Sequence, residues 1–132
     1  MNANHKFNQE IYKHIDDLGV VATPEFRITG KSGYTHKFDF QIMTKEKQIL
    51  IKTVKTLPGK TLKRIILSCI DVMTSATKRT DVIVIVKSKP VWQSWGVICC
   101  DKMARAGIEY VRWSEENEPE RDDLSNMLKE NI

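Results

Sequence analysis

The chain has 132 residues, is 41% hydrophobic and carries a formal net charge of +4. This length predicts one domain with an independent core and no second domain. The N-terminus lacks the apolar run of a signal peptide, and no stretch approaches the roughly 18 apolar residues of a membrane span, so we expect a soluble, cytoplasmic protein with no membrane partner. The cysteines, at positions 69, 99 and 100, have neither a CxxC nor a Cys/His spacing, which predicts buried reduced thiols rather than a zinc motif.

Charge is distributed unevenly along the chain. Residues 43–90 hold eleven Lys or Arg residues against three Asp or Glu residues, a formal charge of +8, whereas residues 109–132 hold three against eight. A basic segment of this density can neutralise several phosphates and predicts salt-dependent binding to nucleic acid. Lysines that only solvate an exposed face would give the same pattern, so both interpretations stay open.

The first half of the chain predicts a helix followed by three strands. Apolar residues at helical spacing predict an amphipathic helix over residues 6–18. Residues 20–28 predict a first strand bent at Pro24, and the glycine-rich segment that follows supplies a hairpin turn. Residues 36–42 and 48–54 alternate apolar and polar side chains, which predicts two further strands.

The second half predicts alternating helices and strands. Residues 61–76 have the apolar spacing of a helix that packs on the sheet. Residues 81–86 contain an uninterrupted β-branched run, which is typical of a strand covered on both faces in the middle of a sheet. We expect a helix over residues 92–106, a last strand over 108–113, and an acidic tail or short helix over 115–132 after a domain spanning 1–114.

Asp39 and Lys52 lie among apolar neighbours on the second and third predicted strands. A carboxylate and an ammonium group are costly to desolvate, so their convergence in one pocket would indicate a site able to hold a divalent metal and polarise a phosphate. A cross-strand ion pair is the simpler interpretation of the same two residues and stays open.

The predicted order, αβββαβ followed by a further helix and strand, resembles the common core of the restriction-endonuclease-like PD-(D/E)XK superfamily, an α/β fold with a mixed sheet. More narrowly, the segments GKSGYTHKFDF at 30–40, LIK at 50–52, GI at 107–108 and WS at 113–114 resemble a C-terminal domain of unknown function in small prokaryotic and phage proteins. The resemblance spans roughly residues 25–115.

The superfamily resemblance implies a metal-dependent nuclease site. In active members an Asp on the second core strand and an acid two positions before a Lys on the third bind magnesium, and the Lys activates or positions the attacking water. Asp39 matches the metal ligand and Lys52 the lysine, but Leu50 stands where the second acid belongs, which predicts a degenerate site. Glu25 and Glu10 are candidate substitutes for that acid.

Two functions follow from these expectations. The first is a nucleic-acid-interacting protein with an inactive site or, if active, a magnesium-dependent nuclease site. Its expected phosphate contacts are Lys37, Lys55, Lys60, Lys63, Arg64, Lys78 and Arg79. The second is a phage or mobile-element protein that binds and modulates a host protein, such as a defence complex, without catalysis. In either case Trp92 and Trp95 could mediate a protein contact or a homodimer.

Overall fold

The computed structural model describes residues 5–54, 59–75, 79–86, 107–112 and 125–129. Its elements are α1 (His5–Asp17), β1 (Ala22–Thr29), β2 (Thr35–Met43), β3 (Lys47–Val54), α2 (Gly59–Ser75), β4 (Arg79–Val86) and β5 (Ile108–Arg112). This order confirms the predicted αβββαβ core and the strand that follows it. The helix expected over residues 92–106, with Trp92 and Trp95, lies outside the described residues.

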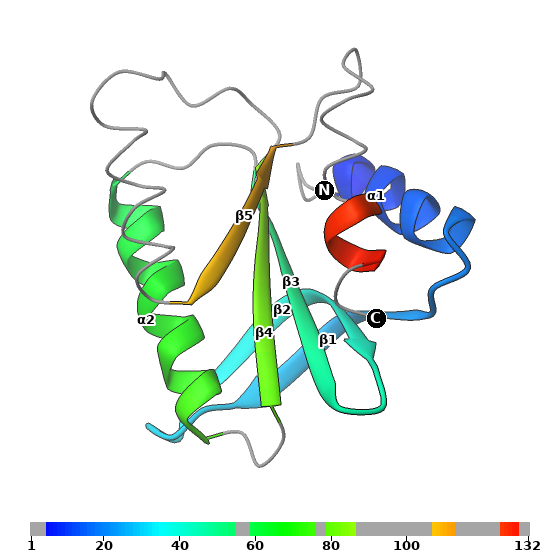
Figure 1. Cartoon of the computed structure of the whole chain (residues 1–132). Coiled ribbons are helices and arrows are strands. Elements are labelled where there is room, and N and C mark those ends of the chain that lie inside the picture. Colours follow the sequence, from blue (N-terminus) through cyan, green and yellow to red (C-terminus); the bar gives the residue numbers. More distant parts are fainter. Residues whose placement is uncertain (1–4, 55–58, 76–78, 87–106, 113–124, 130–132) are drawn as a thin grey trace.

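The five strands form one mixed sheet in sequence order. The first three strands pair antiparallel, whereas β3, β4 and β5 pair parallel. Parallel neighbours need a crossover connection, and α2 supplies one between β3 and β4. Figure 1 shows α2 on one face of the sheet and α1 on the other, with the short helix of residues 125–129 beside α1. The chain is therefore a single α/β domain, as the sequence predicted.

The two faces of the sheet bury separate apolar clusters. The cluster under α1 includes Phe7, Ile11, Ile15, Phe40, Ile51 and Ile83. The cluster under α2 includes Leu50, Ile65, Cys69, Val72, Val82 and Val84. Because β4 supplies side chains to both clusters, it is covered on both faces, which confirms the interpretation of its β-branched run.

The buried faces of the two helices differ in detail from what the apolar spacing predicts. That spacing places Tyr12 and Ile70 on the stripes that face the sheet, but each residue is 43% exposed. Val72 is fully buried instead of Ile70, because Ile65, Cys69 and Val72 keep the i, i+4, i+7 spacing that faces the sheet. Near the C-terminus, residues 125–129 form a short helix, and Leu128 joins the core. No described helix is both long enough and apolar enough to cross a bilayer.

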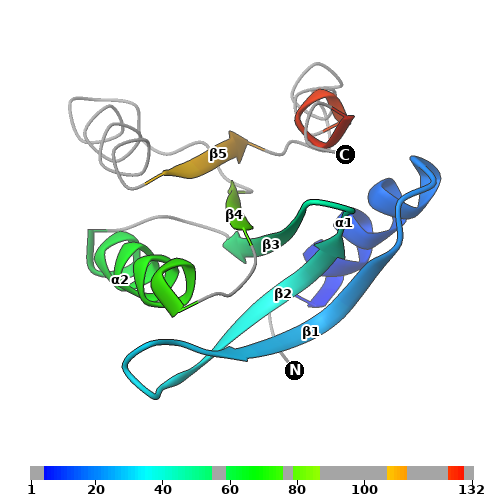
Figure 2. The ribbon, with the colours of Figure 1, turned by 60° about the horizontal axis from the view of Figure 1, so that its bottom comes forward.

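The hairpin of β1 and β2 changes faces half-way along its length. Phe40 belongs to the cluster under α1, yet Phe38, two residues away, belongs to the cluster under α2, although strict alternation would keep both on one face. The switch falls at Asp39 on β2 and at Glu25, which lies opposite it on β1. The φ of Glu25 is 52°, in the left-handed region. Figure 2 shows the outer half of the hairpin running toward α2. As a result the paired ladder of β2 and β3 begins only at Phe40.

Candidate functional site

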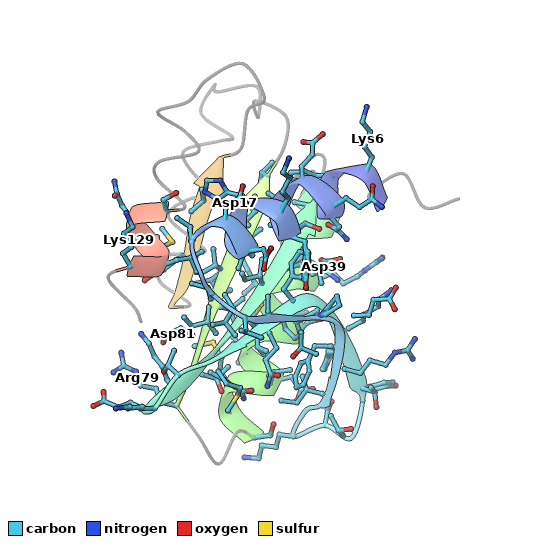
Figure 3. The ribbon with its side chains drawn as sticks, turned by 90° about the vertical axis from the view of Figure 1, so that its right-hand side faces the viewer. Lys6, Asp17, Asp39, Arg79, Asp81 and Lys129 are labelled. Carbon is cyan, nitrogen blue, oxygen red and sulfur yellow. The ribbon has the colours of Figure 1, made fainter. Side chains whose placement is uncertain are left out.

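Asp39 lies beneath α1, where β2 has parted from β3 (Figure 3). Its Oδ2 accepts a hydrogen bond from the backbone N–H of Thr53 at 2.8 Å, and its Oδ1 accepts one from the Asn8 side-chain amide at 2.9 Å. The Thr53 hydroxyl in turn donates to the side-chain oxygen Oδ1 of Asn8. Because Thr53 is 1% exposed, its amide needs a partner, and the Asp39 carboxylate replaces the ladder acceptor that β2 no longer supplies.

Lys52 points to the opposite side of the sheet. It alternates with Ile51 and Thr53, and so shares its face with Leu50 and Val54 in the cluster under α2. Its Nζ donates to the backbone carbonyl oxygen of Lys37 at 3.0 Å, which bridges the parted strands a second time.

The expectation that Asp39 and Lys52 share a pocket is therefore wrong. Strand register alone would place the two residues opposite one another, but the change of face in β2 turns the carboxylate toward α1. No ion pair joins these two described residues either, so the cross-strand pair is also wrong. Both side chains instead satisfy backbone groups where the strands separate.

Of the other two candidate acids, only Glu25 is among the described residues that line the same cavity as Asp39. This cavity is a pocket of about 360 Å³ that we call the α1 pocket. Glu10 is half-buried on α1 and is not among the described residues that line this pocket. Within the described residues, no group of three or more His, Cys, Asp or Glu side chains could hold a metal ion.

A structural role for Asp39 predicts a loss of stability on substitution. Asp39→Ala leaves the buried Thr53 amide without an acceptor, and we expect it to reduce the free energy of unfolding by about 1–3 kcal/mol. Asp39→Asn keeps one acceptor oxygen and should lose clearly less. Urea denaturation of the three proteins measures the difference. Equal stability of wild type and Asp39→Ala would contradict the bridging role.

A second cavity of about 340 Å³ lies between the start of β2, the end of β3 and α2. Lys37, Lys52 and Arg64 line it, and its described lining residues include no Asp or Glu; we call it the basic pocket. Lys37 and Arg64 are exposed and form no ion pair with a described residue. Arg27 lies directly opposite Lys37 on β1 and adds to the positive charge. This arrangement attracts an anion and repels a metal ion.

Cys69 lines the same cavity but is a poor nucleophile. Burial raises the pKa of its thiol to about 12, and the nearby positive charge of Lys52 offsets only part of that effect. The thiol is therefore protonated at neutral pH, and protonated thiols react slowly. The basic pocket offers positive charge for binding rather than a thiolate for covalent chemistry.

Asp71 on α2 ties the hairpin loop to that helix. Its Oδ1 accepts a hydrogen bond from the Ser32 amide at 2.8 Å, and its Oδ2 accepts bonds from the Ser32 hydroxyl at 2.7 Å and from His36 Nε2 at 2.6 Å. Gly30 is required here, because a Cβ at this position would lie 2.0 Å from Asp71 Oδ2. We call these four residues the hairpin latch. Since His36 also lines the basic pocket, the latch fixes the start of β2 against α2.

The latch should respond to acid in a defined range. The hydrogen bonds from Ser32 and His36 lower the pKa of Asp71 from 3.8 to about 2. A carboxyl whose pKa is lower in the folded state stabilises the fold above its unfolded pKa, and this contribution is lost as the pH falls through the folded pKa. The stability difference between wild type and Asp71→Asn should therefore shrink as the pH falls between about pH 4 and pH 2. Thermal unfolding across this range measures it; a difference that persists at pH 2 would contradict the assignment.

The structure separates the residues that were expected to contact phosphate. Lys37 and Arg64 meet in the basic pocket, and Lys63 is exposed next to Arg64 without lining the cavity. Arg79 lies at the other end of the sheet beside Asp81, as Figure 3 shows. Arg79 pairs with Lys47 on β3. Lys47 lies five residues before Lys52, so these two positions are roughly 17 Å apart along the strand. Lys55, Lys78 and the side chain of Lys60 lie outside the described part of the chain.

Sequence reasoning missed two contributors to this region. It assigned no role to Asp71, because nothing local in one sequence links a helical acid to a loop 39 residues earlier. It also omitted Arg27, whose position opposite Lys37 depends on strand register. The glycine-rich segment that contains Gly30 was the available signal for Asp71, because glycine often marks a position where another group closely approaches the backbone.

The family described as "Domain of unknown function DUF1829" matches residues 30–116. The chain belongs to this family. The DUF1829 region begins at Gly30. It includes the whole hairpin latch and the three cationic residues of the basic pocket, Lys37, Lys52 and Arg64, whereas Asn8 and the rest of α1 precede it. No curated protein is significantly similar to the chain in sequence.

Two solved structures show the same fold. A protein of unknown function, AF1548, superposes with a TM-score of 0.60 at 12% identity, over 81% of this chain and 56% of that one. The small subunit of the heterodimeric restriction endonuclease R.BspD6I superposes with a TM-score of 0.52 at 16% identity, over 86% of this chain and 64% of that one. The DUF1829 chain thus has a restriction-endonuclease-like fold and spans less than two thirds of either neighbour.

Proposed function

We propose that this chain binds the phosphate backbone of nucleic acid through the basic pocket, on a nuclease-like scaffold that does not cut. The observation that carries the proposal is the grouping of Lys37, Lys52 and Arg64 around one cavity with no described carboxylate in its lining. Like charges gathered around one cavity repel one another, and a bound phosphate relieves that repulsion. Arg27 opposite Lys37 strengthens the same argument, because like charges directly across two strands are destabilising.

The same geometry supports binding without hydrolysis. Asp39 accepts hydrogen bonds from Thr53 and Asn8 on the α1 side of the sheet, whereas Lys52 faces the α2 side. An acid and a lysine on opposite faces cannot act on one phosphate. Lys52, which matches the nuclease lysine, would then bind phosphate, while Asp39 stabilises the fold.

Fluorescence anisotropy with labelled single- and double-stranded DNA and RNA tests the binding. We expect affinity to fall steeply as salt is added, with a logarithmic slope of about 0.7–0.9 for each phosphate contacted. In parallel, neither wild type nor Asp39→Ala should cut these strands with magnesium or manganese. Absence of binding to any nucleic acid at low salt would overturn the proposal and turn attention to a protein partner. Cutting by wild type that Asp39→Ala abolishes would overturn its non-catalytic part.

A further inference from the structure

The α1 pocket has a chemistry opposite to that of the basic pocket. Its described lining consists of Asn8, Gln9, Tyr12, Pro24, Glu25, Lys37, Asp39 and Phe40. Two of these are carboxylates, and three are Tyr, Pro and Phe with flat apolar surfaces. At about 360 Å³ the cavity is within the size range of small-ligand sites. Lys37 is shared with the basic pocket, so the two cavities are neighbours on either side of β2.

The charges in the α1 pocket disfavour a phosphate inside it, because two carboxylates outweigh the one positive charge of Lys37. Asp39 and Glu25 repel an anion, but each carboxylate oxygen can accept more than one hydrogen bond. Asp39 uses each of its oxygens once, for Asn8 and Thr53, and retains acceptor capacity toward the cavity. A neutral ligand that carries N–H donors fits this surface.

Tyr12 provides an aromatic surface at the same place. Its ring is 6.0 Å from that of Phe40, centroid to centroid, at 33°, and the residue is still 43% exposed. Phe40 therefore supports the Tyr12 ring, while much of the tyrosine remains open. Nucleobases stack on such exposed rings whichever base is present, because every base has a flat aromatic face.

We propose that the α1 pocket receives an unpaired nucleobase of a single strand whose phosphates lie in the basic pocket. This inference rests on the proposed function and adds the ligand: single-stranded nucleic acid, with the base stacked on Tyr12 and its exocyclic amino group donating to Asp39 or Glu25. Lys37, between the cavities, contacts the phosphate that links them. Cytosine, adenine and guanine carry such an amino group and thymine does not, so the pocket favours these three bases over thymine. A paired base within a duplex is stacked and cannot enter.

Matched strands test the proposal. Binding of a labelled oligo-dC is compared by fluorescence anisotropy with that of an abasic strand of equal length, which has the same phosphates and no bases. We expect the strand with bases to bind about 5- to 150-fold more tightly, the range for stacking of one base. Oligo-dT should fall between the two. Equal affinity of oligo-dC and the abasic strand would overturn the base site.

Substitutions at Tyr12 locate the effect. Tyr12→Phe keeps the ring and should preserve the preference for bases, whereas Tyr12→Leu keeps apolar contact with Phe40 but removes the ring and should abolish it. Tyr34→Ala is the control, because Tyr34 is 74% exposed in the hairpin loop and lines neither pocket. A preference that survives in Tyr12→Leu would overturn the assignment of the pocket.

The outcomes separate the two proposals. Salt-dependent binding that is equal for strands with and without bases would leave the phosphate interface standing and remove the base site. No binding of either strand at low salt would remove both.

Discussion

Replacing Lys37 and Arg64 together by glutamine should lower the affinity for single-stranded DNA about 25-fold at ~0.1 M salt and reduce the logarithmic salt slope by about 1.4. Each of these side chains is exposed in the basic pocket, so each is expected to neutralise one phosphate. Loss of one contact on a single strand removes about 0.7 from the slope, which corresponds to about fivefold in affinity at this salt concentration. Anisotropy titrations at several salt concentrations give both numbers.

A charge-matched variant provides the control. Lys45 lies in the turn between β2 and β3, at the far end of those strands, and Lys129 lies on the short C-terminal helix; both are exposed. Changing these two to glutamine alters the net charge by the same amount but leaves the basic pocket intact. It should change the affinity less than about twofold. Equal losses in the two double variants would mean that net charge, rather than the basic pocket, governs binding.

Gly30→Ala should lower the melting temperature by several degrees, as much as Asp71→Ala does. The added methyl group would lie 2.0 Å from Asp71 Oδ2, so it expels the carboxylate from its hydrogen bonds with Ser32 and His36. Once Asp71 has been replaced by alanine, the methyl group has no carboxylate to displace. The Gly30→Ala change should then be nearly neutral, and the two substitutions should be strongly non-additive. Thermal unfolding of both single variants and the double variant measures this coupling.

Gly19→Ala supplies the contrast for this cycle. Gly19 has a φ of 78°, and a Cβ added there would meet nothing within 4 Å, so its substitution costs backbone strain of about 1–2 kcal/mol without a clash. That cost should be the same in the wild type and in the Asp71→Ala variant because the two sites are independent. Additive effects for Gly30 as well as for Gly19 would show that the glycine and the carboxylate do not compete for one position.

Periodicity was enough to predict the order of the elements. The β-branched run ending at Val86 indicated a strand covered on both faces, and β4 is such a strand. The alternating segments around Asp39 and Lys52 indicated neighbouring strands, and they pair antiparallel. These features depend on local spacing and on burial averaged over several residues, which is the information that a single sequence carries most directly.

The positions of the site residues were harder to predict because they depend on a break in that periodicity. A regular β2 would place Asp39 on the same face as Lys52, as the sequence suggested. The left-handed conformation at Glu25, a residue type with no strong preference for it, accompanies the switch that separates them. Contacts such as Asp71 with Ser32 depend on how the hairpin packs against a distant helix, so residue spacing alone does not reveal them.

Chemical-shift perturbation in two-dimensional NMR spectra tests the central claim most directly. A short single strand is added stepwise to the ¹⁵N-labelled chain at low salt, with added salt as the reversal control. We expect the largest shifts on the amides around Lys37, Lys52 and Arg64, and we expect them to disappear as salt is raised. Shifts concentrated around Arg79 and Lys45 at the opposite end of the sheet, or no shifts at all, would contradict this expectation.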